Sequence, residues 1–485
     1  MYTLELVALV SFVFAYLLTP SIRGWFLKIG WLDRPDGDRK MHATPVPRVG
    51  GIAIALAYLG TYGILAILRL NGWKVTPIDF GLVLSILPGA AVVFLIGLLD
   101  DKRTVRPWVK LVVQVAAALV AFAGGLHVKI FHLAFVEKWW VSLPLTLFWL
   151  VLCTNAFNLI DGMDGLSSGL GLCATITLIC VATIHHNYAL LLATIPLAGA
   201  LLGFLPYNSN PASVFLGDCG SYALGFLLGC FGIVWSQESA TLLGLTAPIV
   251  CFAVPLLDLL LAVTRRLLSA NPLFGPDRLH VHHRLLDRGL TPRRAVLILY
   301  ASAAVAAAFA LLSTLLRDTY ASLVLIPFFC SVWLGVRNLG GAGVQAVDPV
   351  VLFGRARHVL LSDKIVQTAR KKLRTAQNLH TRWDVLRSTA GQLGFCYVAT
   401  TLEGVNFFES FDAVDESPAW IVTIPLEGGG KVQLAHRQEK HELATTSLGA
   451  LTELLRTHLT PPPEHSRTAE EPLSEVCSFE KVAGD

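Results

Sequence analysis

Long apolar runs, separated by short polar stretches, dominate the first 340 positions of the chain. A helix needs roughly 20 mostly apolar residues to cross the hydrocarbon core of a bilayer. The pattern predicts eleven such helices, at about 2–20, 50–69, 78–99, 107–126, 141–160, 165–184, 188–206, 220–236, 240–264, 294–315 and 319–337. We therefore expect residues 1–340 to form an all-α polytopic membrane domain.

The pattern changes after about residue 345, where polar and charged residues become frequent. We predict helical spacing at 358–391, strand-like runs at 395–401, 420–425 and 431–435, a turn at 427–430 and a closing helix at 446–459. We expect a small α+β domain over 345–460, without a catalytic constellation. A disordered tail is expected over 461–485, which begins with consecutive prolines and is rich in acidic residues.

Basic residues between the predicted helices indicate how the chain is oriented. Sixteen Lys and Arg lie in one set of alternate connections and five in the other set. Basic connections favour the cytoplasmic side of a membrane. The sequence thus predicts an N-terminus outside, a C-terminal domain in the cytoplasm, and a set of polar motifs on the cytoplasmic side.

The overall composition supports this assignment. Hydrophobic residues make up 54% of the chain and charged residues only 15%, below the roughly 25% of a soluble globular protein. This excludes a disordered, collagen-like or disulfide-rich chain. The net charge of +4 is too weak to indicate nucleic acid. The nine cysteines are scattered and are expected to be buried free thiols.

Acidic residues mark the ends of two predicted helices. Asp100 and Asp101 close one helix, where carboxylates oppose the helix dipole, so a cation or basic ligand would relieve their repulsion. Asn158, Asp161 and Asp164 lie in a run, Asn-x-x-Asn-x-x-Asp-Gly-x-Asp-Gly, that places polar residues on one helical face. Solvated helix ends or a plain interhelical turn are the simpler alternatives.

A third motif, Phe-Leu-Gly-Asp-x-Gly-Ser, ends a loop that begins near Asn208. Asp218 precedes a predicted helix, so an N-cap is its simplest role. Phe215 either stacks on a base or anchors the loop in the membrane interface. The two readings of Phe215 are equally supported.

Two further motifs are basic. His280, His282, His283 and Arg284 provide either zinc ligands or, in the interpretation that we favour, donors to phosphate and sugar hydroxyls. Lys40, His42 and Arg48 either set topology and contact anionic lipid or cradle a phosphate. Asp258, inside a predicted span, either forms an ion pair with Arg265 or belongs to a site wall.

The motifs, in this order on a chain of about eleven spans, resemble the polyprenyl-phosphate N-acetylhexosamine-1-phosphate transferases, glycosyltransferase family 4. The resemblance covers about residues 1–340. The run His-Val-His-His-Arg-Leu-Leu is similar to the branch that transfers N-acetylglucosamine 1-phosphate. The resemblance to the family implies a magnesium-dependent phosphotransferase of the bacterial inner membrane. In this reaction undecaprenyl phosphate attacks UDP-N-acetylglucosamine, UMP leaves, and a cell-envelope glycan such as lipopolysaccharide or teichoic acid begins.

The resemblance also implies residue roles. Asp218 matches a magnesium ligand, with Mn²⁺ as a substitute, and Asp100 and Asp101 match the acidic pair that positions or deprotonates the lipid phosphate. Asp161 is also expected to be catalytic and to line the nucleotide site. The expected nucleotide-binding residues are Asn158, Asp164, Asn208 and Phe215. The expected sugar- and phosphate-binding residues are His280, His282, His283, Arg284, Lys40, His42 and Arg48. The family often has a basic residue at Thr104, and its expected substitutes are Lys102, Arg103 and Arg106.

Several points stay open at this level. Another UDP-amino sugar, including UDP-N-acetylmuramoyl-pentapeptide, is an alternative donor, and a nucleotide-sugar or ion transporter is an alternative function. Transporters place ionisable residues near the bilayer midplane, whereas these acids lie at helix ends. The expected partners are a UDP-sugar, undecaprenyl phosphate and membrane lipid, without nucleic acid. The oligomeric state, including a homodimer, and the role of the C-terminal domain are not defined.

Overall fold

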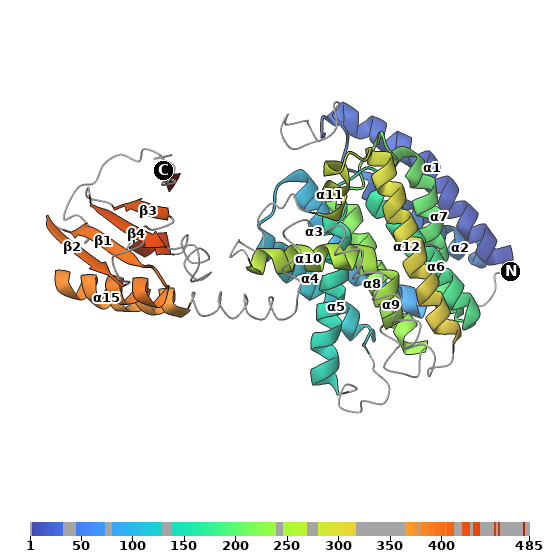
Figure 1. Cartoon of the computed structure of the whole chain (residues 1–485). Coiled ribbons are helices and arrows are strands. Elements are labelled where there is room, and N and C mark those ends of the chain that lie inside the picture. Colours follow the sequence, from blue (N-terminus) through green and yellow to red (C-terminus); the bar gives the residue numbers. More distant parts are fainter. Residues whose placement is uncertain are drawn as a thin grey trace. The chain divides into compact units, whose positions relative to one another are not determined.

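The chain forms two compact units (Figure 1). The first contains Met1–Val263 and Pro276–Gly341, and the second contains Thr264–Gly275 and Ala342–Asp485. The computed structural model describes residues 2–32, 45–72, 80–128, 138–238, 246–268, 280–316, 364–376, 378–402, 404–411, 420–426, 430–436, 451–452, 454–455 and 479–480.

The first unit is helical. Its helices are α1 (Tyr2–Ile29), α2 (Gly50–Leu70), α3 (Gly81–Lys102), α4 (Pro107–Ala123), α5 (Trp139–Leu159), α6 (Leu166–Ile184), α7 (Tyr188–Asn208), α8 (Gly217–Glu238), α9 (Thr246–Cys251), α10 (Ala253–Leu268), α11 (Val281–Asp287) and α12 (Pro292–Leu315). α10 continues beyond Val263, where this stretch of the first unit ends. In the described ranges, eight helices are long and apolar enough to cross a membrane: α1, α2, α3, α5, α6, α7, α8 and α12. The chain is a mostly helical, multi-pass membrane protein, as predicted.

The predicted span at 240–264 is wrong as a single helix. α9 ends at Cys251 and α10 begins at Ala253, and Figure 1 shows the two helices running in clearly different directions. Pro255 accounts for the break because it has no N–H to donate to the carbonyl of Cys251, four residues earlier. α4 is also short, with 17 residues. The predicted span at 319–337 lies outside the described residues.

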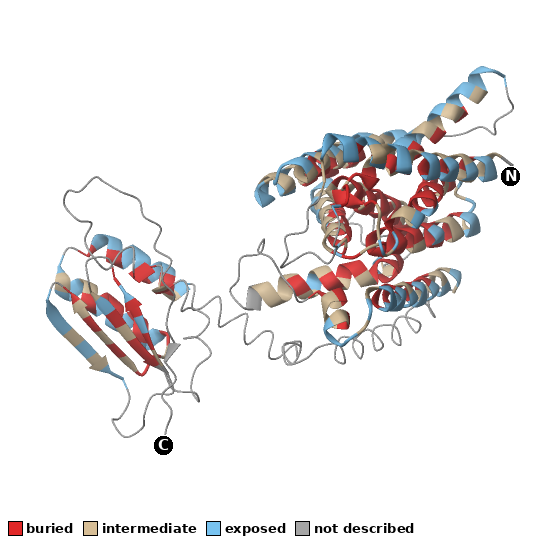
Figure 2. Cartoon of the chain, turned by 90° about the horizontal axis from the view of Figure 1, so that it is seen from above, coloured by how far each residue is buried: buried red, intermediate tan, exposed pale blue. Residues whose placement is uncertain are grey.

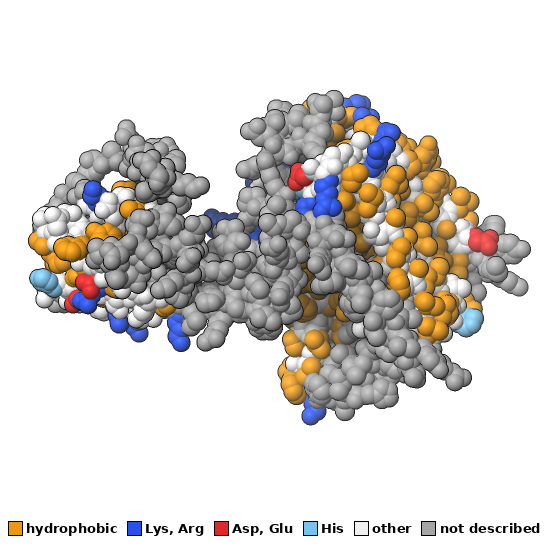
Figure 3. All heavy atoms as spheres, viewed as in Figure 1, with side chains coloured by type: hydrophobic (Ala, Val, Ile, Leu, Met, Phe, Trp, Pro, Cys, Tyr) orange, Lys and Arg blue, Asp and Glu red, His pale blue; other side chains and the backbone are white. Residues whose placement is uncertain are grey.

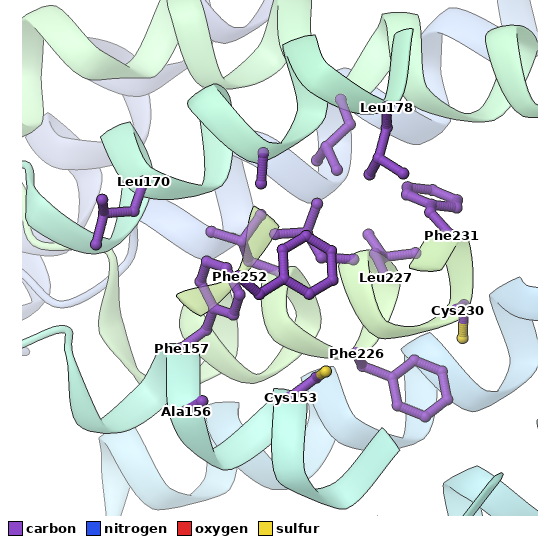
Figure 4. Packing of buried hydrophobic residues seen from close by; sticks show 14 of the residues in the cluster. Cys153, Ala156, Phe157, Leu170, Leu178, Phe226, Leu227, Cys230, Phe231 and Phe252 are labelled. Carbon is purple, nitrogen blue, oxygen red and sulfur yellow. The ribbon is translucent and has the colours of Figure 1, made fainter. Parts of the chain in front are cut away.

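α8 lies at the centre of the helical unit. In its most apolar stretch 89% of the residues are buried, against 22% in α1. Figure 2 shows the buried positions gathered inside the bundle and the exposed positions on its outside. Aromatic rings from three segments, Phe157, Phe231 and Phe252, fill the interior (Figure 4). Hydrophobic side chains cover much of the outer face in Figure 3, as expected for a surface in contact with lipid.

Polar contacts tie several helix ends together at one end of the bundle. The N–H of Gly50, at the start of α2, donates to the carbonyl of Phe215 just before α8 (2.9 Å). The Nε–H of Arg293, at the start of α12, donates to the carbonyl of Asn210 just after α7 (3.1 Å). Helices that run in opposite directions thus bring the starts of α2, α8 and α12 beside the end of α7.

The second unit contains a five-stranded antiparallel sheet with the strand order β2-β1-β4-β3-β5. The strands are β1 (Tyr397–Leu402), β2 (Val405–Ser410), β3 (Trp420–Pro425), β4 (Lys431–His436) and β5 (Phe479–Glu480). α15 (Leu379–Gln392) packs on one face, where Trp383 stacks on Phe407 with ring centroids 5.3 Å apart. Val398, Leu434 and Ile424 are buried on the same face.

The predicted strands at 395–401, 420–425 and 431–435 correspond to β1, β3 and β4. The edge strand β2 was not predicted from the sequence. Its Phe408 side chain is 73% exposed. It also treated 358–391 as one helical stretch, whereas a helix at 364–375 precedes α15.

Of the tail over 461–485 that was expected to be disordered, the described residues are those of β5, whose Phe479 pairs with Val422 of β3. The predicted closing helix at 446–459 is described only at 451–452 and 454–455, which are helical. Most of the predicted turn at 427–430 lies outside the described residues.

Candidate active site

The chain turns tightly into α8 at Gly217. Its φ is +78°, and a Cβ placed there would lie 2.9 Å from the carbonyl oxygen of Arg48 and 2.9 Å from the carboxylate of Asp101. Glycine adopts positive φ without strain and leaves room for this close approach. The turn places Asp218 in the first turn of α8, against α3.

Asp101 caps α8 from the end of α3. Its Oδ1 accepts the N–H of Asp218 (2.8 Å) and its Oδ2 accepts the N–H of Cys219 (2.9 Å). The first N–H groups of a helix lack partners within the helix and carry partial positive charge, so a carboxylate there is stabilising. Asp101, which the sequence predicts to be catalytic, holds the backbone at the start of α8 through these two contacts.

Asp100 is paired with a cation from the next helix. Its Oδ2 forms an ion pair with Nζ of Lys110 in α4, and its Oδ1 accepts the N–H of Val105 (2.8 Å). The Asp100 side chain is only 4% exposed, and its carboxyl lies beside that of Asp218. Sequence reasoning missed Lys110.

The expected substitutes for a basic residue at Thr104 lie between the acidic pair and the start of α4. Lys102 stacks over the ring of Trp31, with its Nζ 5.9 Å from the ring centroid, and Arg103 and Arg106 are exposed. The position of Lys110, one turn into the helix that follows the acidic pair, could have identified it from the sequence as a partner of these acids. Lys110 therefore supplies the positive charge beside Asp100.

Asn158, at the end of α5, fixes the other side of Asp218. Its Nδ2 donates to Oδ1 of Asp218 (2.8 Å) and to Oγ of Ser221 (2.9 Å). Asn155, one turn earlier, instead pairs with the side chain of Gln114 in α4 (2.7 Å from Nδ2 to Oε1). On the predicted polar face of α5, Asn158 thus contacts the site and Asn155 contacts a neighbouring helix.

Asp161 follows the end of α5 and faces the same group of charges. Desolvation raises the pKa of its carboxyl well above the ordinary value, and the negative charges of Asp218 and Asp101 act in the same direction. The positive charge of Arg48 opposes the rise. A group of neighbouring carboxylates favours a further positive ion or a basic ligand.

Two residues expected to bind a nucleotide are engaged in loop contacts. Oδ2 of Asp164 accepts the Nδ2–H of Asn210 (2.9 Å) and the N–H of Ala212 (3.0 Å). Buried Asn208 accepts the hydroxyl of Ser168 (2.5 Å) and donates to the carbonyl of Val214 (3.0 Å). Both side chains shape the loop between α7 and α8.

Phe215 is held through its backbone. Its N–H donates to the carbonyl of Pro47 (2.9 Å), its carbonyl accepts the N–H of Gly50 (2.9 Å), and it forms a parallel bridge with Arg48. The Phe215 side chain is half-buried. The loop before α2 and the loop before α8 therefore form one unit that carries Arg48.

The three histidines gather around α11. The rings of His280 and His282 are stacked with centroids 5.6 Å apart, and those of His282 and His283 are 4.3 Å apart. His282 packs on the Asp161–Gly165 loop, because a Cβ at Gly162 would lie 2.7 Å from its Nε2. Burial and the neighbouring His283 lower the pKa of His282 to about 4, so its ring is neutral at pH 7. Arg284, one residue beyond His283, is half-buried.

Asp258, inside α10, contacts the start of α11. Its Oδ2 lies 3.1 Å from Nδ1 of His280, and its Oδ1 accepts the N–H of Val281 (2.8 Å). Asp258 thus belongs to the wall beside the histidines.

α12 clamps the loop after α5. The hydroxyl of Tyr300 donates to the carbonyl of Gly165 (2.5 Å), and Gly169 leaves the space in which the tyrosine ring lies. Sequence reasoning missed Tyr300 because a tyrosine in an apolar span has no distinctive local pattern.

The helix ends thus bring Asp100, Asp161, Asp218 and the histidines of α11 to one polar region, with Lys110 and Arg48 as nearby cations. Among the described residues, no group of three or more His, Cys, Asp or Glu forms a complete metal cage. The predicted residues Lys40 and His42 lie outside the described part of the chain. Such a region is suited to anionic ligands that complete the coordination of a cation.

Known proteins are similar to this chain in sequence. Residues 83–236 match the family described as glycosyl transferase family 4. The chain is 34% identical over 296 residues to the probable undecaprenyl-phosphate N-acetylglucosaminyl 1-phosphate transferase of Bacillus subtilis, covering 60% of this chain and 80% of the relative. It is 33% identical over 328 residues to the decaprenyl-phosphate N-acetylglucosaminephosphotransferase of Mycobacterium tuberculosis (61% and 79% covered). It is 28% identical over 320 residues to the undecaprenyl-phosphate alpha-N-acetylglucosaminyl 1-phosphate transferase of Escherichia coli K12 (62% and 82% covered). The resemblance drawn from the motifs is confirmed: the chain belongs to glycosyl transferase family 4.

Proposed function

We propose that the chain transfers N-acetylglucosamine 1-phosphate from UDP-N-acetylglucosamine to undecaprenyl phosphate and releases UMP. The product would start a lipid-linked glycan of the cell envelope. The main support is that relatives named for this activity match the chain over about four-fifths of their own length. The meeting of Asp100, Asp161 and Asp218 at one end of the bundle agrees with a reaction between two phosphate compounds.

The reaction forms one bond to phosphorus and breaks another. An oxygen of the lipid phosphate bonds to the β-phosphorus of the donor. The bond from that phosphorus to the oxygen bridging the α-phosphate breaks, and UMP leaves with the electron pair. A phosphate monoester with a second pKa near 6 is largely ionised at pH 7. Asp100 and Asp161 are therefore assigned to positioning more than to proton removal.

We assign Asp218 to a divalent cation, Mg²⁺ or Mn²⁺. The fit is chemical: Asp218 has the Asp100 carboxyl beside it and Asp161 in its field, so a cation would relieve the repulsion. Mg²⁺ is commonly held by one or two carboxylates, substrate phosphates and water, which needs no closed protein cage. When bound, the cation would neutralise charge on the phosphates.

The remaining contacts, to the phosphates, the sugar and the nucleotide, are assigned to basic and neutral side chains. Lys110 and Arg48 are assigned to the phosphates, because Lys110 is paired with Asp100 and the charge of Arg48 acts on Asp161 and Asp101. His280, His283 and Arg284 are assigned to the sugar and pyrophosphate, with His282 as a neutral hydrogen-bonding group. Asn158 and Phe215 keep their assignment to the nucleotide, whereas Asp164 and Asn208 act by shaping the loop.

We place the site on the cytoplasmic side of a bacterial plasma membrane, with the N-terminus outside. The excess of basic residues in the connections at this end supports that side. α9 and α10 together would return the chain from the end of α8 to α11 as one broken crossing. With α4 and the predicted span at 319–337, this gives eleven crossings and a cytoplasmic second unit.

The proposal is tested by supplying the purified protein with undecaprenyl phosphate, Mg²⁺ and one UDP-sugar at a time, and by measuring UMP. We expect release with UDP-N-acetylglucosamine and little with UDP-N-acetylmuramoyl-pentapeptide. Tyr62→Phe is a matched control, since it removes one hydrogen bond, to the Leu192 carbonyl near the opposite end of α7. A folded protein that releases no UMP from any UDP-sugar would defeat the proposal.

A further inference from the structure

Asp258 is a buried carboxylate that the reaction described above does not use. It lies in α10 and is 1% exposed. Burying a charged group is costly unless it is paired and hydrogen-bonded. Here one oxygen accepts the N–H of Val281 and the other lies 3.1 Å from Nδ1 of His280. Both partners stand at the start of α11.

α11 depends on such contacts for its position. It spans only Val281–Asp287, and a helix this short is not stable by itself in water. Its N-cap residue, His280, makes no side-chain hydrogen bond to the helix backbone. The carboxylate of Asp258 therefore fixes the first turn of α11 from another helix.

The contact also orients the first histidine ring. An ionised carboxylate only accepts hydrogen bonds, so Nδ1 of His280 carries the proton and Nε2 is the ring nitrogen left for other partners. The ring of His280 is nearly parallel to that of His282, with an interplanar angle of 5°. His282 in turn packs on Gly162, next to Asp161. A chain of contacts thus runs from Asp258 to the loop of Asp161.

We propose that Asp258 is a positioning residue for the donor half of the site. It acts through His280 and α11 and sets where His282, His283 and Arg284 stand relative to the Asp161 loop. This inference rests on the proposed function, because the donor is taken to be a UDP-sugar. Asp258 contacts α11 through His280 and Val281, so it should affect the donor and leave the lipid phosphate unaffected.

The test uses Asp258→Asn in the full-length protein. Asparagine keeps an oxygen for the Val281 N–H but removes the charge that holds His280. Loss of one hydrogen bond to a charged group corresponds to about tenfold in an equilibrium. We therefore expect amide hydrogen exchange across 281–287 to rise about tenfold. The KM for UDP-N-acetylglucosamine should rise about tenfold, whereas the KM for undecaprenyl phosphate should stay unchanged.

Two further variants sharpen the result. Tyr62→Phe, which loses a hydrogen bond elsewhere in the bundle, should change neither KM nor exchange in α11. Combining Asp258→Asn with His280→Asn should cost no more than His280→Asn alone, because coupled residues are not additive.

Each outcome decides the matter. Unchanged exchange across 281–287 would show that Asp258 does not anchor α11. Faster exchange with unaltered kinetics, or with equal losses for both substrates, would refute a role specific to the donor. If the wild-type protein releases no UMP, the proposed function fails, and hydrogen exchange still decides the anchoring.

Discussion

Asp101→Asn and Asp218→Asn make the same chemical change at two neighbouring acids, and the structure predicts opposite effects on stability. The carboxylate of Asp101 accepts two backbone N–H groups at the start of α8, at 2.8 and 2.9 Å. The carboxylate of Asp218 instead faces the carboxyl of Asp100. The first acid therefore stabilises the fold, and the second introduces repulsion when no cation is bound.

The size of the effect at Asp101 follows from its contacts. Asparagine has one oxygen, so one of the two N–H groups would face the amide nitrogen and lose its acceptor. Losing a hydrogen bond to a charged group and leaving a buried donor unsatisfied costs about 3 kcal/mol. For a domain of this size the thermal midpoint should fall by about 5 °C.

The assay measures thermal unfolding without Mg²⁺ and UMP release with Mg²⁺ for both variants. We expect Asp101→Asn to unfold earlier than wild type and to lose activity, because the start of α8 moves Asp218. Asp218→Asn should lose nearly all activity while unfolding no earlier than wild type. If Asp101→Asn unfolds at the wild-type temperature yet is inactive, Asp101 takes part in the chemistry directly and our assignment of a capping role is wrong.

Three other variants follow from the contacts of the site. Tyr300→Phe removes the hydrogen bond to Gly165 and should cost about 1 kcal/mol of stability with a higher KM for the UDP-sugar; an unaltered KM would argue against the clamp. Lys110→Met leaves Asp100 without its cation, so turnover should fall at least tenfold, or about 1.4 kcal/mol, and normal turnover would remove Lys110 from the site. His282 has a pKa of about 4 when folded and about 6.5 when unfolded, so the folded state binds fewer protons and loses stability as pH falls below about 6.5. Comparing unfolding at pH 7 and pH 5 should show a smaller loss in His282→Asn than in wild type, and equal losses would contradict the assignment.

The sequence was sufficient for the features that depend on local pattern. Long apolar runs predicted the helices of the bundle, and strand-like runs predicted β1, β3 and β4. The break between α9 and α10 was missed, although Pro255 was visible, because an apolar run conceals one missing hydrogen bond. β2 was missed because an edge strand packs mainly through a single position, Phe407.

The candidate site shows a similar limit. Helix ends rich in Asp and Asn indicated which segments meet, but side-chain roles depend on partners far along the chain. Asp100 and Asp101 are adjacent, yet one pairs with Lys110 and the other caps α8, 117 positions away. No local sequence pattern distinguishes the acid that forms the ion pair from the acid that caps the helix. The pairing of Asp258 with His280 likewise requires the tertiary structure.

The central claim is that the sugar moves together with one phosphate. It is tested most directly with UDP-N-acetylglucosamine radiolabelled at the β-phosphate, incubated with the purified protein, undecaprenyl phosphate and Mg²⁺. We predict that the label enters the organic-soluble lipid together with the sugar, while unlabelled UMP remains in the water phase. Label found in UDP, or left in intact donor beside a folded protein, would contradict the account.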